Sequence, residues 1–212
     1  MTQEKLVVEP ASTPAAVTYK LLIGSVVPRP IAFVSSISSN GVLNLAPFSF
    51  FNVICAEPPT VGFSTGYREP SKDTLANIRD TGEFVINIVS EDFAEHMNLT
   101  SGEYPAGVDE FQVSGLTPVP SDLVAPPCVR ESRVNMECKL KQLIEVSTRP
   151  MGATLILGEV VRFHIDESVI IDRLRIDPDQ LRAVGRMGGN EYTRTRDRFE
   201  MIRPQESAWK RS

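Results

Sequence analysis

The sequence predicts a mainly β fold, namely a β-barrel with a few short peripheral helices. Apolar residues recur with a period of two in several segments, which is the pattern of half-buried strands. Segments with helical periodicity are few and short. They interrupt the strands without alternating regularly with them, and this disfavours a doubly wound βαβ fold.

The N-terminal part of the chain predicts one helix and one hairpin. Residues 15–26 form the expected helix, and the β-branched run over residues 31–37 forms the first strand. The Asn40-Gly41 dipeptide follows this run, and Asn-Gly between two strands is the strongest short hairpin signal. We therefore expect the first strand to turn back into an antiparallel neighbour.

The middle of the chain predicts two helices around a strand. Residues 71–80 have the best helix signals, with Ser71 as N-cap and Gly82 just beyond the end. A strand over residues 84–89 and a short helix over residues 92–99 follow.

Two long strands, over residues 134–146 and 155–165, form a second predicted hairpin. Even positions of the first strand are mostly apolar, and its odd positions, such as Asn135 and Glu137, are mostly polar. We expect a half-exposed strand with these odd positions in solvent and Cys138 buried as a small hydrophobe. His164 lies on the polar face of the second strand, so we expect it to be solvated.

The composition excludes several partners and sites. Lys and Arg number 22 against 27 Asp and Glu, for a net charge of -5, and no basic block occurs, so nucleic acid is a poor candidate partner. No apolar run approaches the roughly 20 residues that cross a bilayer, and no signal peptide is recognisable, so we expect a cytoplasmic protein without membrane contact. Three cysteines without C-x-x-C spacing and two distant histidines predict neither disulfides nor a metal site.

An aromatic segment over residues 44–52 is unusual for a plain barrel. Phe48, Phe50 and Phe51 cannot all face one core if this segment is extended. A flat aromatic ligand with hydrogen-bonding edges would cover the remaining face. Alternatively, the three rings pack a corner of the fold or a subunit contact.

Two further segments contain candidate anion ligands. The helix expected at residues 71–80 offers unpaired N–H groups at its start, where Ser71, Lys72 and Thr74 add donors for a phosphate. The alternative is an ordinary helix cap. Arg29 lies between two prolines and projects its guanidinium from an extended backbone, although most arginines in such a setting are surface residues. No nucleophile motif or dinucleotide fingerprint is present, so no residue is assigned a catalytic role.

Several motifs in a fixed order resemble the flavin reductase-like family of the FMN-binding split-barrel superfamily, which includes flavoredoxin-like flavoproteins. The resemblance covers roughly residues 20–195. The motifs are Pro28-Arg29-Pro30-Ile31-Ala32, residues 35–41 and 44–51, Pro58-Pro59, Lys72-Asp73-Thr74 with Asn77, residues 84–87, Glu137-Cys138, Gly158-Glu159-Val160, and Arg186-Met187-Gly188-Gly189 with Tyr192.

This resemblance implies a six-stranded, Greek-key split barrel that forms a homodimer and holds FMN noncovalently near the subunit interface. Carried over to this sequence, the residues expected to line the flavin ring are Asn44, Ala46, Pro47, Phe48, Ser49 and Phe50. Those expected at the phosphate are Ser71, Lys72 and Thr74, with weaker expectations for Arg29, Ser35 and Ser36 along the phosphate and ribityl chain. Arg186 and Tyr192 match a late motif that reaches the site from either subunit.

The implied organisation is an N-terminal arm over residues 1–19, the flavin-binding domain over residues 20–195 and a C-terminal extension over residues 196–212. The implied activity is hydride transfer from NADH or NADPH to FMN, with electrons passed to a partner monooxygenase or another acceptor. Because the cofactor supplies the reactivity, the protein needs no acid, base or nucleophile of its own.

Four other interpretations stay open at this point. The protein could hold FMN as an electron carrier without catalysis, or it could be a noncatalytic structural dimer. A heme-binding split barrel would need His96 or His164 as axial ligand. A pyridoxamine phosphate oxidase would need a second basic cluster for its substrate phosphate, and no such cluster is recognisable.

Overall fold

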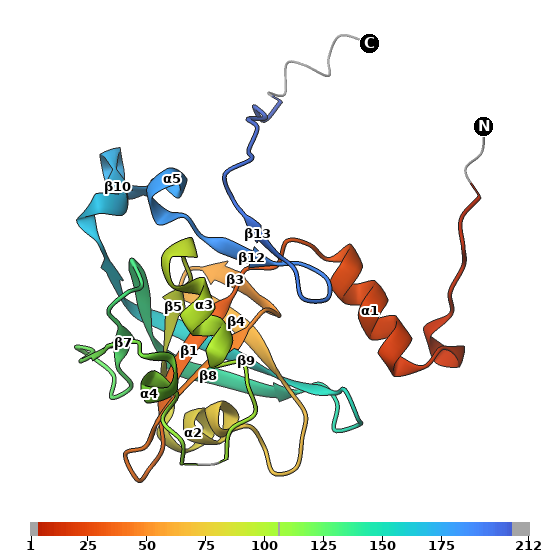
Figure 1. Cartoon of the computed structure of the whole chain (residues 1–212), viewed down its shortest axis with the longest axis horizontal. Coiled ribbons are helices and arrows are strands. Elements are labelled where there is room, and N and C mark those ends of the chain that lie inside the picture. Colours follow the sequence, from red (N-terminus) through yellow and green to blue (C-terminus); the bar gives the residue numbers. More distant parts are fainter. Residues whose placement is uncertain (1–3, 106, 205–212) are drawn as a thin grey trace.

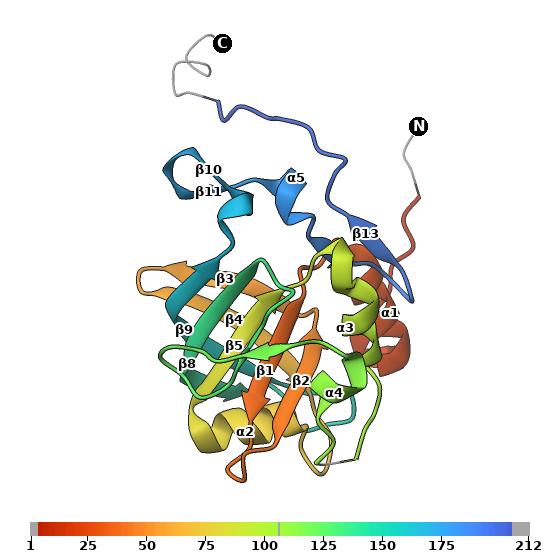
Figure 2. The same ribbon diagram turned by 60° about the vertical axis from the view of Figure 1, so that its left-hand side comes forward.

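The computed structural model describes residues 4–105 and 107–204. In this part of the chain a curled antiparallel sheet has seven strands in the order β2-β1-β5-β8-β9-β4-β3 (Figure 1, Figure 2). The strands are β1 (Ala32–Ile37), β2 (Leu43–Phe48), β3 (Phe51–Ala56), β4 (Pro59–Gly66), β5 (Glu83–Ile88), β8 (Val134–Glu145) and β9 (Ala153–Ile165). The mainly β prediction is confirmed. The resemblance implied six strands, and the described sheet has a seventh because β3 pairs along the edge with β4.

Short elements surround this sheet, as predicted. The helices are α1 (Ala15–Ser25), α2 (Asp73–Thr81), α3 (Ala94–Leu99), α4 (Glu110–Ser114) and α5 (Pro178–Leu181), with single 3-10 turns η1 (Pro10–Ser12), η2 (Glu91–Phe93), η3 (Glu167–Val169) and η4 (Asp172–Leu174). Small paired strands are β6 (Pro118–Val119) with β7 (Cys128–Val129), β10 (Ile170–Ile171) with β11 (Arg175–Ile176), and β12 (Val184–Arg186) with β13 (Tyr192–Arg194). Within the described ranges, every helix is too short or too polar to cross a membrane.

Both predicted hairpins are present. β1 pairs antiparallel with β2, and Gly41 takes the left-handed backbone conformation in the turn, with φ of 82°. The long strands β8 and β9 also pair antiparallel. The strand order places β2 at one edge of the sheet, and Asn44 of this strand bonds to Thr74 at the start of α2.

The boundaries of α2 differ from the prediction at one end. The helix ends as expected, with Gly82 left-handed at the C-cap and φ of 73°. It begins two residues later than Ser71, however, and Lys72 is the N-cap, without a side-chain capping bond. Lys72 therefore lies at the helix terminus, where its ammonium group and the free N–H groups of the first turn share one region.

The interior of the barrel holds the largest apolar cluster. The Phe63 ring lies 5.0 Å from that of Phe48 and 5.6 Å from that of Phe84, measured between centroids. Gly158 faces Phe84, and a side chain there would collide with the ring. The buried members are Ala32, Val34, Phe48, Val61, Phe63, Leu75, Ile78, Phe84, Ile86, Met136, Cys138, Ile156 and Val160.

A second cluster covers the outer face of β1, β2 and β5. Phe33 and Leu45 point to this face, where Phe93, Met97 and Phe111 pack on them from the segments that contain α3 and α4. The central strand β1 is therefore buried on both faces. Because α3 and α4 cross the outside of β2, the loop between them also lies close to the start of α2.

Two of the polar residues predicted to be exposed on β8, Asn135 and Glu137, are buried, which corrects the expectation. Asn135 is 7% and Glu137 0% exposed, because the segment around β6 and β7 covers this part of the sheet. The Glu137 carboxylate accepts hydrogen bonds from the backbone N–H groups of Asp122, at 2.8 Å, and Leu123, at 2.6 Å. Its Oε1 also lies 2.5 Å from Nε2 of His164, so His164 pairs with a buried acid and is not simply solvated.

The second half of β8 reverses its faces. The pairing register with β9 shifts between Leu140 and Gln142, and such a bulge exchanges the inward and outward positions. Cys138, before the bulge, is buried as predicted, whereas Ile144 and Val146 are exposed despite their place in the apolar phase.

Helix α1 stands away from the barrel (Figure 1) and has no buried residue. Its apolar side chains Val17, Tyr19, Leu21 and Leu22 are between 43% and 57% exposed. The helix also spans the predicted boundary at residue 19 between arm and domain. That domain division stays a prediction.

Candidate functional site

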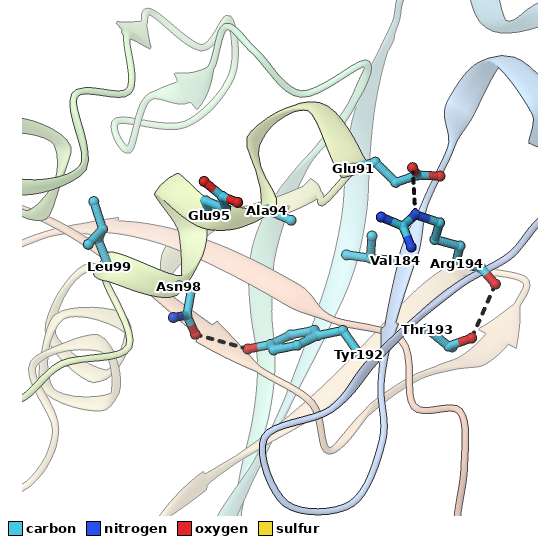
Figure 3. Close-up of a pocket in the computed structure, with 9 residues that line it drawn as sticks. All are labelled: Glu91, Ala94, Glu95, Asn98, Leu99, Val184, Tyr192, Thr193 and Arg194. Atoms are coloured by element: carbon cyan, nitrogen blue, oxygen red, sulfur yellow. Dashed lines mark hydrogen bonds and ion pairs between the residues drawn. The ribbon is translucent and has the colours of Figure 1, made fainter.

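Three adjoining hollows form a groove along α3 and the loop that follows it. The first, the α2 hollow, lies at the start of α2, and the second, the Arg186 hollow, shares Pro47 and Ser101 with it. The third, the α3 hollow, shares Asn98 and Tyr192 with the second and is drawn in Figure 3. Because neighbouring hollows share these lining residues, the three lie side by side.

The α2 hollow brings together five of the predicted ligands, namely Asn44, Ala46, Pro47, Lys72 and Thr74. Its cavity volume is about 140 Å³, and its other lining residues are Arg68, Asp73, Thr100, Ser101, Gly102, Glu103, Tyr104 and Glu110. Strand β2 supplies the first three predicted ligands, and the N-terminus of α2 supplies the other two.

Two cationic side chains face this hollow. Burial lowers the pKa of Lys72, and the neighbouring positive charge of Arg68 lowers it further, against an opposing influence of Glu103. The Lys72 ammonium also lies 5.7 Å from the centroid of the Phe48 ring. An anion between Lys72 and Arg68 would relieve their mutual repulsion, so this region suits a phosphate group.

A buried polar network fixes the wall of the α2 hollow. The side-chain amide of Asn44 donates to Oγ of Ser36 at 3.1 Å and to Oγ1 of Thr74 at 2.9 Å. The amide of Asn77 also donates to Ser36 at 3.1 Å. Because Thr74 Oγ1 accepts from Asn44, its own hydrogen is available to a ligand in the hollow.

Three acids, Asp73, Glu103 and Glu110, also line the α2 hollow. Glu110 is 7% exposed, and its Oε2 accepts the backbone N–H of Leu45 at 3.1 Å. Burial raises the pKa of Glu110, as do the charges of Asp73 and Asp109, although the bond from Leu45 opposes this. The carboxyl group thereby ties α4 to β2.

The Arg186 hollow is wider, with a cavity volume of about 570 Å³. The Arg186 guanidinium lies over the Tyr192 ring, 4.4 Å from its centroid, and donates to the carbonyl of Gly189 at 2.5 Å. The remaining lining residues are Ile31, Pro47, Ser49, Met97, Asn98, Ser101 and Asn190. Predicted ligands Ser49, Arg186 and Tyr192 therefore meet here, and pockets of this size accept flat organic ligands.

Arg29, Ser35 and Ser36 do not line the groove. The guanidinium of Arg29, which is 6% exposed, donates to the carbonyls of Ile23 and Val26, each at 2.7 Å, and to that of Met187 at 2.8 Å. It therefore holds the end of α1 against the β12–β13 turn. Ser35 donates to the carbonyl of Pro127 at 2.5 Å on the outer face of β1, and Ser36 lies behind Asn44.

Three more predicted ligands lie outside the three hollows. The Phe48 ring packs in the barrel core, and Phe50 is 45% exposed elsewhere on the surface. Phe51 is partly buried against the core, so the three rings do not share one environment. Ser71 lines a neighbouring depression with Arg68 and Lys72.

Sequence reasoning did not select several residues of the groove. Arg68 begins the same segment as Lys72, and its positive charge was the signal that could have marked it as a phosphate ligand. The run Asn98–Gly102, which contains small and polar residues at the end of a predicted helix, was the other signal. Glu110 gave no signal because an isolated glutamate on a short helix resembles any surface acid.

The curled antiparallel sheet and its lateral groove define a split-barrel protein of the flavin reductase type. The model for the family described as "Flavin reductase like domain" matches residues 23–185. The chain belongs to this family, and the resemblance noted in the sequence is confirmed.

Three solved structures are similar to this chain. Nitrilotriacetate monooxygenase component B from Bacillus cereus is 35% identical, with a TM-score of 0.90 over 94% of this chain and 100% of that chain. A 2-nitrobenzoate 2-nitroreductase from Pseudomonas fluorescens is 32% identical, with a TM-score of 0.86 over 95% of this chain and 98% of that chain. A protein with a split barrel domain from Shewanella frigidimarina shares the fold, at 24% identity. Its TM-score is 0.80 over 92% of this chain and 96% of that chain. The family and the first two neighbours support an oxidoreductase.

Proposed function

We propose that this protein is a cytoplasmic, NAD(P)H-dependent flavin oxidoreductase that binds FMN noncovalently and works as a homodimer. The observation that supports FMN most directly is the α2 hollow, where Lys72 and Arg68 accompany the N-terminus of α2. A terminal phosphate fits this donor set because it carries nearly two negative charges and accepts several hydrogen bonds. FAD has no terminal phosphate, so the same donors favour FMN.

In this proposal the groove orients the cofactor along its length. Lys72, Arg68 and Thr74 hold the phosphate, and the flavin ring occupies the Arg186 hollow. Ser49 and Asn98 offer hydrogen bonds to the ring edge, while Arg186 and Tyr192 form a flat wall. FMN supplies the chemistry when bound, by accepting a hydride and releasing electrons, and the residues of the chain bind, orient and shield it.

The proposed electron acceptor is a partner monooxygenase or another acceptor that reaches the flavin. The similarity to nitrilotriacetate monooxygenase component B supports a monooxygenase partner. A heme interpretation has less support. Nδ1 of His96 lies 2.7 Å from the Ser114 carbonyl, His164 contacts Glu137, and neither histidine lines the three hollows.

Anaerobic mixing of the FMN-loaded protein with NADH, and separately with NADPH, tests the proposed activity. We expect the oxidised flavin absorbance to bleach within seconds with at least one donor, because the groove continues beyond the flavin position and leaves room for a nicotinamide. This reaction needs no acceptor, so the unknown partner does not affect the result. Bound flavin that stays oxidised with both donors would refute the reductase and favour an electron carrier.

The exposed surface of α1 supports the proposed homodimer. An isolated helix of 11 residues is marginal in water, and α1 has apolar side chains around its circumference with a single lysine. The edge strand β3 adds Val53, 68% exposed, and Ile54, 53% exposed. Exposed apolar side chains of this kind mark an interface, and a second copy of the chain would cover them.

Sedimentation velocity at micromolar concentration is expected to show a dimer. Leu22→Glu places a charge on the exposed apolar face of α1, so we expect this variant to shift toward the monomer. Lys20→Glu is the matched control on the same helix because it changes a side chain that is already charged. A wild-type monomer that retains FMN would contradict the dimer.

A further inference from the structure

The α3 hollow continues the groove beyond the proposed flavin position. It lies between α3 and the β12–β13 hairpin (Figure 3), and its cavity volume is about 530 Å³. The Tyr192 hydroxyl donates to Oδ1 of Asn98 at 3.2 Å, and these two side chains form the wall shared with the Arg186 hollow. A ligand that reaches the flavin from this side would therefore have a second place to bind next to it.

One side of the α3 hollow is apolar. Ala94 and Leu99 line it from α3, and Val184 and the Tyr192 ring line it from the hairpin. Val184 is 9% exposed and belongs to the second apolar cluster, on the outer face of the sheet, so packing fixes its position at the base of the α3 hollow. A flat purine base could pack against such an apolar surface.

The rim of the α3 hollow is charged. Glu91 binds three arginines, and Nε of Arg194 is one of these contacts, at 3.0 Å. Among the described residues, no partner occupies either terminal nitrogen of Arg194, and its side chain is 74% exposed. Arg194 thus offers donors for a phosphate, while the exposed carboxylate of Glu95 across the hollow offers acceptors for ribose hydroxyls.

We infer that the α3 hollow binds the adenosine diphosphate half of the nicotinamide donor. This inference rests on the proposed reductase function. Ala94, Leu99, Val184 and Tyr192 contact the adenine, and Arg194 contacts the pyrophosphate, while the nicotinamide turns toward the flavin in the Arg186 hollow. The chain would then recognise its donor without the Gly-rich dinucleotide fingerprint, which its sequence does not contain.

The test compares NADH, or NADPH if that is the preferred donor, with reduced nicotinamide mononucleotide, which has the same hydride-donating ring but no adenosine half. In anaerobic flavin reduction, Ala94→Trp fills the hollow. We expect it to raise the half-saturating dinucleotide concentration at least 10-fold, with little change for the mononucleotide. Arg194→Ala should act in the same direction, and Arg175→Ala, an exposed arginine outside the groove, is the control. Equal effects on both donors, or none on the dinucleotide, would overturn the inference.

Calorimetric titration with ADP-ribose separates this inference from the proposed function. ADP-ribose has no nicotinamide, so its binding requires no flavin reduction. We expect the FMN-loaded wild type to bind it and Ala94→Trp to lose that binding, with unchanged flavin content. Absence of wild-type binding would refute the α3 hollow as the site even where flavin reduction is observed. Binding without any reduction would refute only the reductase.

Discussion

Replacing both Lys72 and Arg68 with alanine is expected to weaken FMN binding by at least 100-fold. Both cations face the α2 hollow at the start of α2. A charge-assisted hydrogen bond contributes about 1.5 to 3 kcal/mol, and about 1.4 kcal/mol corresponds to a tenfold change in affinity. Lys72→Ala alone should therefore weaken binding roughly 10-fold to 100-fold. Titration of apoprotein into FMN, followed by flavin fluorescence, measures these constants.

The control for this pair is Lys139→Ala, which removes a positive charge from an exposed position of β8. It should leave FMN affinity unchanged if the effect arises from contact and not from net charge. Burial lowers the pKa of Lys72, so its charge is lost at a lower pH than that of an ordinary lysine. FMN affinity should accordingly fall in the alkaline range in the wild type. Full affinity in the double variant would remove the phosphate from the α2 hollow.

The parts of the fold that the sequence predicts correctly depend on local signals. Asn40-Gly41 specifies the β1–β2 turn, and Gly82 specifies the end of α2, because each requires a backbone conformation that few residues adopt. The hairpin of β8 and β9 follows from two long runs of alternating residues around one turn. These signals act within a few residues and need no knowledge of the rest of the chain.

The prediction for β8 failed where a distant segment determined the environment. Alternation shows that two faces differ, but it does not show that residues near Asp122 and Leu123 cover the polar face and bury Glu137. The bulge after Leu140 is also invisible in the pattern, and it exposes Ile144. In both cases the missing information is tertiary.

The candidate site shows the same division. The predicted ligands from β2 and from the start of α2 that line the α2 hollow were selected because each lies in a short, chemically distinctive segment. Arg29 does not line the three hollows because the carbonyls that bind its guanidinium come from the end of α1 and from Met187, 158 residues away, and the sequence does not show this packing. Arg68 was not selected although it lies in the same segment as Lys72. The loop after α3 was not selected because only the packing of α3 and α4 across β2 brings that loop to the hollow.

Glu137→Ala is expected to lower the free energy of unfolding by about 3 kcal/mol or more, because it removes two backbone hydrogen bonds to a charged group, and each contributes about 1.5 to 3 kcal/mol. The wild-type carboxylate is fully buried. It accepts hydrogen bonds from two backbone N–H groups and also contacts His164. Alanine leaves these N–H groups without acceptors and frees the segment around Asp122 from the sheet. Glu137→Gln should not restore stability, because its amide presents hydrogens where donors already converge. Urea unfolding at fixed protein concentration measures the change.

The pH dependence distinguishes this ionic role from simple packing. Burial alone would raise the pKa of Glu137, but the N–H of Asp122, the His164 side chain and the N–H of Leu123 hold it below the ordinary value. A depressed carboxyl pKa gives stability that is present above the unfolded-state pKa, about 4.3, and lost as the pH falls through the folded-state value. The wild type should therefore lose stability in acid more steeply than Glu137→Ala. Glu145→Ala, at an exposed position of the same strand, should retain both the stability and the acid slope of the wild type. The free energy of unfolding of Glu137→Ala could instead lie within about 0.5 kcal/mol of the wild-type value, which is the range of an ordinary surface substitution. That result would show that the buried carboxylate does not hold this segment to the sheet.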